Sequence, residues 1–259
     1  MRVVSLTCSN TEIVCALGRG HMLVGVDNHT DYPEDVIAGL PRVGPDLQID
    51  VAAVARLKPD LVLASLTVPG HERIVEELTR ARLPFIAPEP VSLEDVYGDI
   101  RRIGAELGAV ARAAALVESM QRELASAPQP SRAPRVLVEW WPKPVIAPGR
   151  LSWVDDLLTC AGAVNPLHEA AVKSKPLTDE QACELLPDAI VISWCGVKVQ
   201  KYRPEVVYRR PAWQSLPALE QRRVYAIAEA YLGRPGPRLV EGFRALRRIV
   251  DDFAASTES

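Results

Sequence analysis

Several features that mark other classes of protein are missing from this 259-residue sequence. No apolar run approaches the roughly 18 residues of a transmembrane helix, so we expect no membrane insertion. There is no excess of positive charge either, because 30 Lys and Arg residues stand against 33 Asp and Glu. Binding to nucleic acid depends on cationic side chains that neutralise phosphates, so we expect no nucleic-acid partner.

Sequence motifs of the common enzyme classes are missing as well. There is no GxSxG elbow, no HExxH, no P-loop and no GxGxxG after an expected strand. The five cysteines are an odd number without CxxC spacing, which favours reduced thiols over a disulfide framework or a zinc site. We therefore expect a binding protein and no enzyme.

The start of the sequence bears on the compartment. The first expected strand, Arg2 to Leu6, follows Met1 directly, without the charged and apolar regions of a signal peptide before it. For the chain as given, this predicts a cytoplasmic protein, whereas removal of a leader would make it periplasmic or otherwise extracytoplasmic. The composition, 48% hydrophobic and 24% charged, is typical of a globular protein.

One long helix is expected near the middle of the chain. Residues 109–127 contain strong helix formers and no Gly or Pro, and the proline-rich segment that follows cannot continue a helix. The stretches on either side have similar lengths, and each opens with an apolar strand. This predicts an N-terminal α/β lobe over 1–108, a connecting helix over 109–127 and a C-terminal α/β lobe over 128–259.

Strands alternate with helices in both halves, which predicts parallel sheets with helices on their faces. Helix signals support this pattern: Ser9 to Glu12 reads as a capping box, Asp50 as a cap and Gly162 as a helix end. Ligands of such sheets bind beyond the carboxyl ends of the strands. We therefore expect the site in the loops that follow the strands.

Tryptophans gather in those loops and suit a broad, partly apolar ligand. Trp140 and Trp141 end one expected strand, and its alternation sends them to opposite faces, so only one of them is expected to contact the ligand. Trp194 follows another strand, where it either lines the ligand site or belongs to the core.

Larger segments resemble a known family, the class III substrate-binding proteins of ABC importers, and within it the cobalamin-binding branch typified by BtuF. The resemblance covers nearly the whole chain. It implies a class III periplasmic-binding-protein fold, with two Rossmann-like lobes joined by a single long helix and cobalamin, a corrinoid, held as the bound ligand in the cleft between them. The segments that carry it are VVSLTCSNTEIVCALG, LVGVDNHTDYP, LKPDLVLAS, LLTCAGAVNPL, RPAWQSLPALEQRRVYAI and AYLGRPGPRLVEG.

The resemblance also assigns residues to the ligand. His29 stands where a relative has an aromatic contact, while Ser65 and Asp46 stand where it has tryptophans, so aromatic contacts must come from elsewhere. Arg234 is placed to meet an amide or phosphate oxygen. The expected ligand-binding residues are Cys8, Ser9, His29, Tyr32, Ser65, Trp141, Trp194, Tyr231, Leu232 and Arg234.

Two further roles follow from the chemistry and the resemblance. A neutral imidazole can ligate cobalt, so His29 is a candidate metal ligand. Glu180 matches an acidic residue that docks onto the ABC permease, whereas Ala52 stands at the matching place in the first lobe. A permease partner is therefore left open, a cytosolic corrinoid carrier is the alternative to import, and the protein is expected to be a monomer.

Two alternatives to cobalamin binding stay open from the sequence. The first is binding of another large chelate, haem or a ferric siderophore, although siderophore sites usually need more cationic groups. The second is a chelatase-like enzyme acting on metal and tetrapyrrole, in which His29 and a nearby carboxylate would move protons or deliver metal.

Overall fold

The computed structural model describes residues 1–125 and 130–257, and it divides into two compact units. The N-terminal unit comprises Met1–Pro90 and Glu94–Ser119, and the C-terminal unit comprises Val91–Leu93 and Met120–Ser259. Each unit has its own sheet and core, as the alternation of strands and helices predicts.

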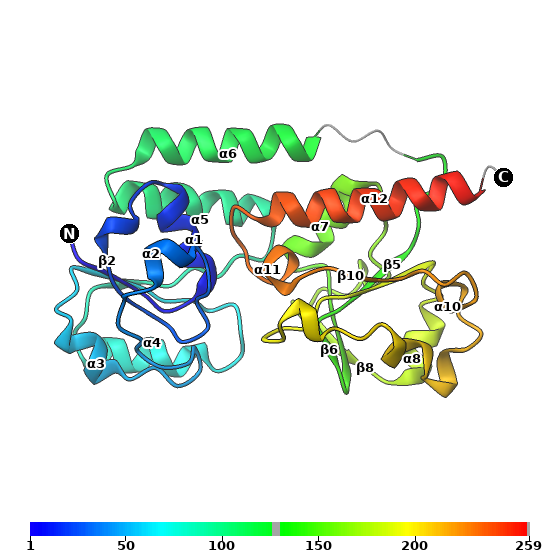
Figure 1. The fold of residues 1–259 in the computed structure, drawn as a ribbon, viewed down its shortest axis with the longest axis horizontal. Coiled ribbons are helices and arrows are strands. Elements are labelled where there is room, and N and C mark those ends of the chain that lie inside the picture. The colour runs from blue at the N-terminus through cyan, green and yellow to red at the C-terminus, as the bar shows by residue number, and fades with distance from the viewer. Residues whose placement is uncertain (126–129, 258–259) are drawn as a thin grey trace. The chain divides into compact units, whose positions relative to one another are not determined.

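The N-terminal unit is built on a four-stranded parallel sheet with the strand order β2-β1-β3-β4. Figure 1 shows helices on both sides of these strands. All three residues of β1 and of β3 are buried, as expected for central parallel strands with both faces covered. The strands are β1 (Val3–Ser5), β2 (Leu23–Val26), β3 (Leu61–Leu63) and β4 (Phe85–Ile86).

The helices of this unit cover the sheet with apolar side chains. Val54, Ile74 and Leu78 from two of them pack in one cluster with Val4 and Val62 of the strands. The helices are α1 (Cys8–Ala16), the 3-10 helix η1 (Gly20–Met22), α2 (Glu34–Ile37), α3 (Val51–Arg56), α4 (His71–Arg80), α5 (Leu93–Glu106) and α6 (Val110–Ala125), the last two being shared with the C-terminal unit at their ends.

Two of the expected caps of this unit have different outcomes. Asp50 caps α3 as expected, because its carboxylate accepts a hydrogen bond from the backbone N–H of Ala53 at 2.9 Å. The capping box at Ser9 is wrong, since α1 begins one residue before Ser9 and its N-cap is Thr7, which makes no side-chain cap hydrogen bond. Ser9 therefore lies within the first turn of the helix.

The long helix expected over 109–127 is present as α6. The division between the two units falls inside it, after Ser119. Val117 and Met120, on either side of this division, are both buried. Residues 126 and 127 lie outside the described residues, and the lobe boundaries at 108 and 128 stay a prediction.

The C-terminal unit contains the expected parallel sheet, of order β10-β9-β5, and a second sheet that the sequence did not predict. The second sheet is antiparallel, of order β6-β7-β8, and its first strand begins at Trp141, which we expected to end the strand before it. The strands are β5 (Val136–Glu139), β6 (Trp141–Pro142), β7 (Val145–Pro148), β8 (Ser174–Leu177), β9 (Ala189–Ile192) and β10 (Val224–Ala226).

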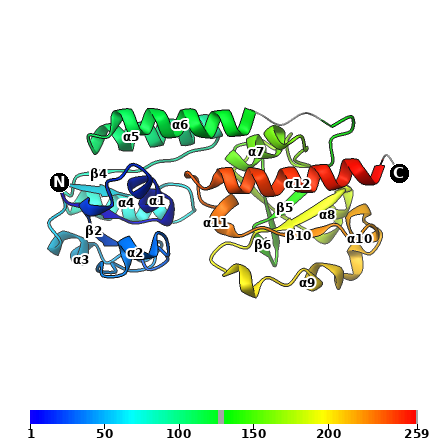
Figure 2. The same ribbon diagram turned by 45° about the horizontal axis from the view of Figure 1, so that its top comes forward.

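Helix ends in this unit follow local signals. Gly162 ends α7 with φ of 84°, a left-handed conformation that glycine adopts without strain. Thr178 and Gln181 form a reciprocal capping box at the start of α8. Figure 2 shows α12 running beside α7. The helices are α7 (Trp153–Ala161), α8 (Asp179–Glu184), η2 (Val199–Lys201), α9 (Glu205–Tyr208), η3 (Pro211–Trp213), α10 (Pro217–Glu220), α11 (Glu229–Leu232) and α12 (Leu239–Thr257).

None of the helices in the described part of the chain combines the length and apolar character needed to cross a membrane.

Asp99 in α5 makes the stability of the protein depend on pH. Burial raises the pKa of its carboxyl from 3.8 to about 6, and the charge of Arg102 offsets this only in part. The folded state then holds the proton more tightly than the unfolded chain does. The free energy of unfolding therefore decreases as the pH rises from about 4 to about 6 and stays lower above that range.

We expect Asp99→Asn to raise the free energy of unfolding by about 1–2 kcal/mol at pH about 8, after allowing for partial exposure of the carboxyl. At pH about 3 the substitution should have little effect, because Asp99 is then protonated in both states. Urea denaturation at the two pH values measures this difference. An equal effect at both would show that the carboxylate charge is not responsible.

Candidate functional site

The candidate residues of the N-terminal unit lie where the parallel strands end. Thr7 follows β1, and Ser65 follows β3. Asp27 to Thr30 form the loop after β2. Because the strands are parallel, their carboxyl ends lie at one edge of the sheet, as the sequence predicts for a ligand site.

The loop after β2 is held by Asp27, which is fully buried. Its carboxylate accepts hydrogen bonds from the Thr30 hydroxyl and from the backbone N–H of His29, the latter at 2.8 Å. Arg42 donates to the carbonyls of Asp27 and Thr30 at 2.9 and 2.6 Å. These bonds fix the backbone, and the side chain of His29 remains 54% exposed.

A cluster of His29, Asp46 and His71 lies at the same edge. The two carboxylate oxygens of Asp46 lie 3.7 Å from Nε2 of His29 and 3.6 Å from Nε2 of His71. The interaction with His71, more than that with His29, lowers the pKa of Asp46, so this carboxyl is ionised at neutral pH. From the sequence, Asp46 was noted only because it replaces a tryptophan of a relative, and His71 was not predicted as a site residue.

His71 begins α4 and is 3% exposed. Its Nδ1 accepts a hydrogen bond from the backbone N–H of Val68 at 3.4 Å, which places the ring proton on Nε2. Nε2 is buried and makes no hydrogen bond, because Asp46 lies just beyond hydrogen-bond distance. His71 therefore presents an unsatisfied N–H donor.

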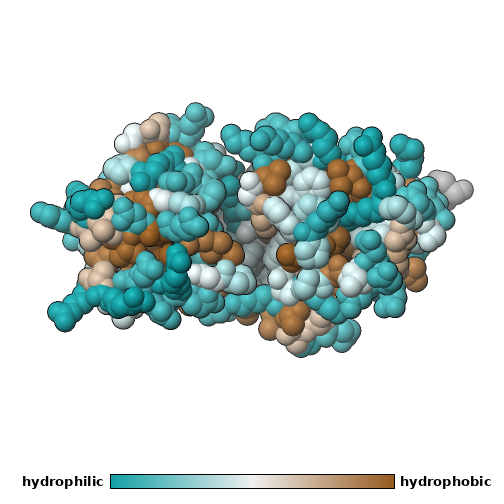
Figure 3. Space-filling model, turned by 90° about the horizontal axis from the view of Figure 1, so that it is seen from below, coloured by the Kyte–Doolittle hydropathy of each residue, from teal (hydrophilic) through white to brown (hydrophobic). Residues whose placement is uncertain are grey.

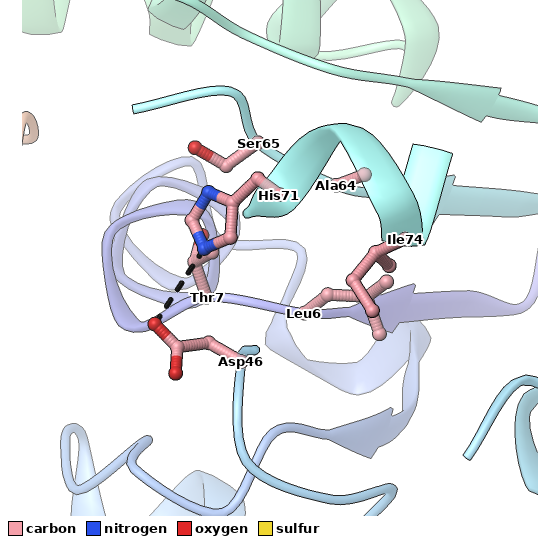
Figure 4. A pocket seen from close by; sticks show the side chains of 7 residues that line it. All are labelled: Leu6, Thr7, Asp46, Ala64, Ser65, His71 and Ile74. Atoms are coloured by element: carbon pink, nitrogen blue, oxygen red, sulfur yellow. Dashed lines mark ion pairs between the residues drawn. The ribbon is translucent and has the colours of Figure 1, made fainter. Parts of the chain in front are cut away.

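This donor faces a small hollow of about 10 Å³, which has room for about one water molecule or one polar atom of a ligand. Figure 4 shows the imidazole of His71 and the carboxylate of Asp46 facing each other there, with Ser65 beside them. Ser65 is 6% exposed, and its hydroxyl pairs with that of Thr67 at 2.9 Å. The residues that line the hollow are Leu6, Thr7, Asp46, Ala64, Ser65, His71 and Ile74.

Exposed apolar side chains belong to the same loops. Leu47 follows Asp46 and is 41% exposed, and Val68 precedes His71 and is 40% exposed. Tyr32, an expected contact, is 48% exposed. Figure 3, a view from below, shows apolar patches interrupting a largely hydrophilic surface. Exposed large apolar groups beside a polar pair are typical of ligand-binding surfaces.

The two remaining candidates of this unit lie at the start of α1. Cys8 is half-buried, and Ser9 is 8% exposed with its hydroxyl 3.3 Å from that of Thr7. Their contact with a ligand stays a prediction.

In the C-terminal unit, Trp194 occupies the core and not an open surface. It is 7% exposed and packs in the apolar cluster with Tyr202, at 5.4 Å between ring centroids. Its Nε1–H donates to Oε1 of Glu139 at 2.8 Å. Of the two roles that the sequence allowed, the structure favours the core role.

The buried partner of Trp194 belongs to an ion pair that the sequence did not predict. Glu139 is 0% exposed and ends β5, and Arg210 donates to both of its carboxylate oxygens, at 2.7 and 2.9 Å. Arg210 also stacks on Trp213, with its guanidinium carbon 4.3 Å from the ring centroid. This network lies beneath the loops that follow β5 and β9.

Trp140 and Trp141 separate as strand alternation predicts. Trp140 packs on Trp153 at 6.1 Å between ring centroids, and its Nε1 is buried. Trp141 lies in β6, where it is 42% exposed. Of the two, Trp141 has the surface to offer a ligand.

Tyr231, an expected ligand contact, lies in the short helix α11. Tyr231 is half-buried beneath the guanidinium of Arg238, which lies 5.6 Å from its ring centroid. Leu232 was expected to contact the ligand, but its side chain is 0% exposed and cannot do so in this structure. Its carbonyl accepts a hydrogen bond from Nε1–H of Trp153. Arg234 pairs with Glu229 at 3.1 Å, which balances its charge.

The comparisons with known proteins give the family. A family model described as periplasmic binding protein matches residues 3–231. The chain belongs to the periplasmic binding protein family. Members of this family are substrate-binding proteins of ABC transporters and not enzymes. At the level of the family, this supports a binding role and leaves the chelatase-like alternative without support.

The individual relatives are named for different ligands. The chain is 32% identical over 258 residues to the uncharacterized ABC transporter substrate-binding lipoprotein YvrC of Bacillus subtilis, covering 96% of this chain and 79% of that protein. It is 26% identical over 247 residues to a vitamin B12-binding protein of Pectobacterium atrosepticum, with 92% and 84% covered. The periplasmic heme-binding protein RhuT of Roseiflexus matches with a TM-score of 0.81 and 27% identity over 98% of each chain.

These matches confirm the class III fold, and of the two compartments that we considered they support the extracytoplasmic one at the level of the family. The family is described as periplasmic, and the relative in Bacillus subtilis is a lipoprotein. A cytoplasmic location of this periplasmic binding protein therefore has no support.

The candidate docking residue Glu180 lies in the exposed first turn of α8. A hollow of about 530 Å³ opens beside it, lined by Asp179, Lys143, Arg209 and neighbouring residues of the C-terminal unit. None of the expected ligand-binding residues lines this hollow. Docking of a permease at Glu180 stays a prediction.

His29 is the only residue for which we expected a metal contact. Within 1–125 and 130–257, no group of three or more His, Cys, Asp and Glu side chains could hold a metal ion on its own. The cluster of His29, Asp46 and His71 is thus better described as a set of hydrogen-bonding and charged groups. A single bond from His29 to cobalt in a ligand stays a prediction.

Proposed function

We propose that this periplasmic binding protein binds a corrinoid, cobalamin, by the loops at the carboxyl ends of its strands, and that it works outside the cytoplasm with an ABC permease. The observation that carries the proposal is the charge of the candidate residues. Arg234 is the only Arg or Lys among them, and Glu229 already balances it. Asp46 adds a negative charge at the edge of the N-terminal sheet.

This charge pattern suits a ligand with a neutral periphery. Cobalamin carries carboxamides around its macrocycle, whereas haem carries two propionates and ferric siderophores are commonly anionic. An anionic ligand would meet Asp46 without an additional cation among these candidates to offset the repulsion. The similarity to a vitamin B12-binding protein and the cobalamin-like segments of the sequence support the same choice.

Exposed aromatic rings supply the apolar part of the proposed contact. Trp141 of the C-terminal unit is 42% exposed and Tyr32 of the N-terminal unit is 48% exposed, so each ring offers apolar surface to a flat macrocycle. Cys8, Ser9, Ser65, Tyr231 and the backbone of the α11 segment are proposed as secondary contacts.

Titration with cyanocobalamin and with haemin, followed by visible spectroscopy, tests the proposal. We expect saturable binding of cyanocobalamin by the wild-type protein, much tighter than that of haemin. Trp141→Ala should weaken cyanocobalamin binding about tenfold or more, because contact area on a large aromatic ring is lost. Val164→Ala, which shortens another exposed apolar side chain of the C-terminal unit, is the matched control and should bind like wild type.

The same titration with hydroxocobalamin tests the predicted cobalt contact. A spectral change that disappears in His29→Ala would show ligation by the imidazole. Saturable binding of haemin without binding of either cobalamin would contradict the proposed function.

A further inference from the structure

We propose that Asp46 and His71 form a subsite for a primary carboxamide of the bound ligand and select an amide over a carboxylate at that place. This inference rests on the proposed function, and it assigns a specificity role to two residues outside the predicted site. It begins with the unsatisfied donor of His71.

A buried N–H without a hydrogen-bond partner is costly unless a ligand or water completes it. The Val68 amide occupies Nδ1 of His71, and this leaves Nε2–H as the donor. The ring is 3% exposed and begins α4, so the donor has a fixed direction into the hollow. The site is therefore prepared for one acceptor atom.

Asp46 supplies the complementary acceptor beside this donor. Its Oδ1 accepts from the backbone N–H of Leu47 at 3.0 Å, which holds the carboxylate in place. Its Oδ2 lies 3.6 Å from Nε2 of His71, too far for the two groups to satisfy each other fully. A donor and an acceptor thus stand side by side, and each retains capacity for a further partner.

A primary carboxamide matches this pair because it also places a donor beside an acceptor. Its oxygen can accept from His71 while its N–H donates to Asp46, and the hollow of about 10 Å³ has room for one such polar atom. A carboxylate offers no donor, and its charge is repelled by Asp46. The exposed side chains of Leu47 and Val68 lie beside the pair in sequence and suit the apolar ring edge that bears the amide.

His29 also lies beside the pair, with its Nε2 3.7 Å from Oδ1 of Asp46. Its side chain is 54% exposed to solvent, which screens its effect on a bound group. The selection is therefore assigned to Asp46 and His71.

The experiment compares cyanocobalamin with its monocarboxylic acids, each with one peripheral carboxamide hydrolysed to a carboxylate. At pH about 7.5, where these acids are ionised, wild-type protein should bind cyanocobalamin about tenfold or more tightly than at least one of them. In Asp46→Asn this preference should fall to within about threefold, because the repelling charge is gone. His21→Gln, at an exposed histidine of the same unit, is the matched control and should keep the wild-type preference.

Two results would overturn the subsite. One is that wild-type protein binds every acid as tightly as cyanocobalamin, a measurement that needs no variant to fold. The other is that Asp46→Asn, shown by circular dichroism to be folded, keeps the full preference. Failure of wild-type protein to bind cyanocobalamin at all would instead overturn the proposed function, and the subsite with it.

Discussion

Replacing Glu139 with alanine is expected to lower the free energy of unfolding by about 3–5 kcal/mol, the range found when one partner of a buried ion pair is removed. Glu139 is completely buried, and it accepts two hydrogen bonds from Arg210 and one from Trp194. Its removal leaves the guanidinium of Arg210, only 11% exposed, without its compensating charge. Urea denaturation measures the loss.

Two further variants separate charge from shape at this position. Glu139→Gln keeps an oxygen that can accept from Trp194 but removes the charge, so we expect a smaller loss than in Glu139→Ala. The paired replacement Glu139→Leu with Arg210→Met removes both charges together and should cost less than Glu139→Ala alone, since no unpaired charge stays buried. Equal losses in all three variants would show that lost packing, and not the unpaired charge, sets the cost.

Glu139→Ala should also disturb the loops that are proposed to bind the ligand. Glu139 is the last residue of β5, directly before Trp140 and Trp141, and its indole partner Trp194 follows β9. We therefore expect Glu139→Ala to weaken cyanocobalamin binding in addition to lowering stability. Trp141 can be disturbed in this way although Glu139 itself is not accessible to a ligand.

Local signals made much of this fold predictable from the sequence. The cap at Asp50, the glycine at 162 and the capping box at Thr178 act within a few residues of themselves, so the chain around them specifies the helix ends. The capping box at Ser9 was wrong because Thr7 and Ser9 are both residue types that cap helices, and α1 already begins at Cys8, directly after Thr7.

Long-range pairing explains most of what the sequence did not predict. Glu139 lies 55 residues from Trp194 and 71 from Arg210 along the chain, and no local pattern links them. The sheet β6-β7-β8 consists of strands of two to four residues that contain prolines, which hides strand alternation.

One residue of the pair in the N-terminal unit had a weak signal in the sequence. His71 lies in the segment that follows β3, where the site was expected, whereas Asp46 lies between α2 and α3. What the sequence could not show is that the His71 ring is buried with one nitrogen unsatisfied.

Trp213→Ala is expected to have an effect as large as that of Glu139→Ala, about 3–5 kcal/mol, because it empties the space of a completely buried aromatic side chain. Trp213 packs in the main apolar cluster of the C-terminal unit, and its Nε1–H donates to Oδ1 of Asp179 at 2.9 Å. Trp213→Phe keeps most of the apolar volume and loses the hydrogen bond, so it should cost about 1–2 kcal/mol. Trp141→Ala, at a half-exposed tryptophan, serves as the control and should change stability by less than about 1 kcal/mol.

Arg210 connects this prediction to the first, because it binds Glu139 and stacks on the ring of Trp213. Each single substitution removes one of these two contacts of the guanidinium. In the double variant Glu139→Ala with Trp213→Ala, the second loss acts on an arginine that is already displaced. The combined cost should therefore fall short of the sum by about 0.5–3 kcal/mol, the range of coupling between residues of one network. Strict additivity would mean that Arg210 relaxes independently at each contact and that the two halves of the network stabilise the unit separately.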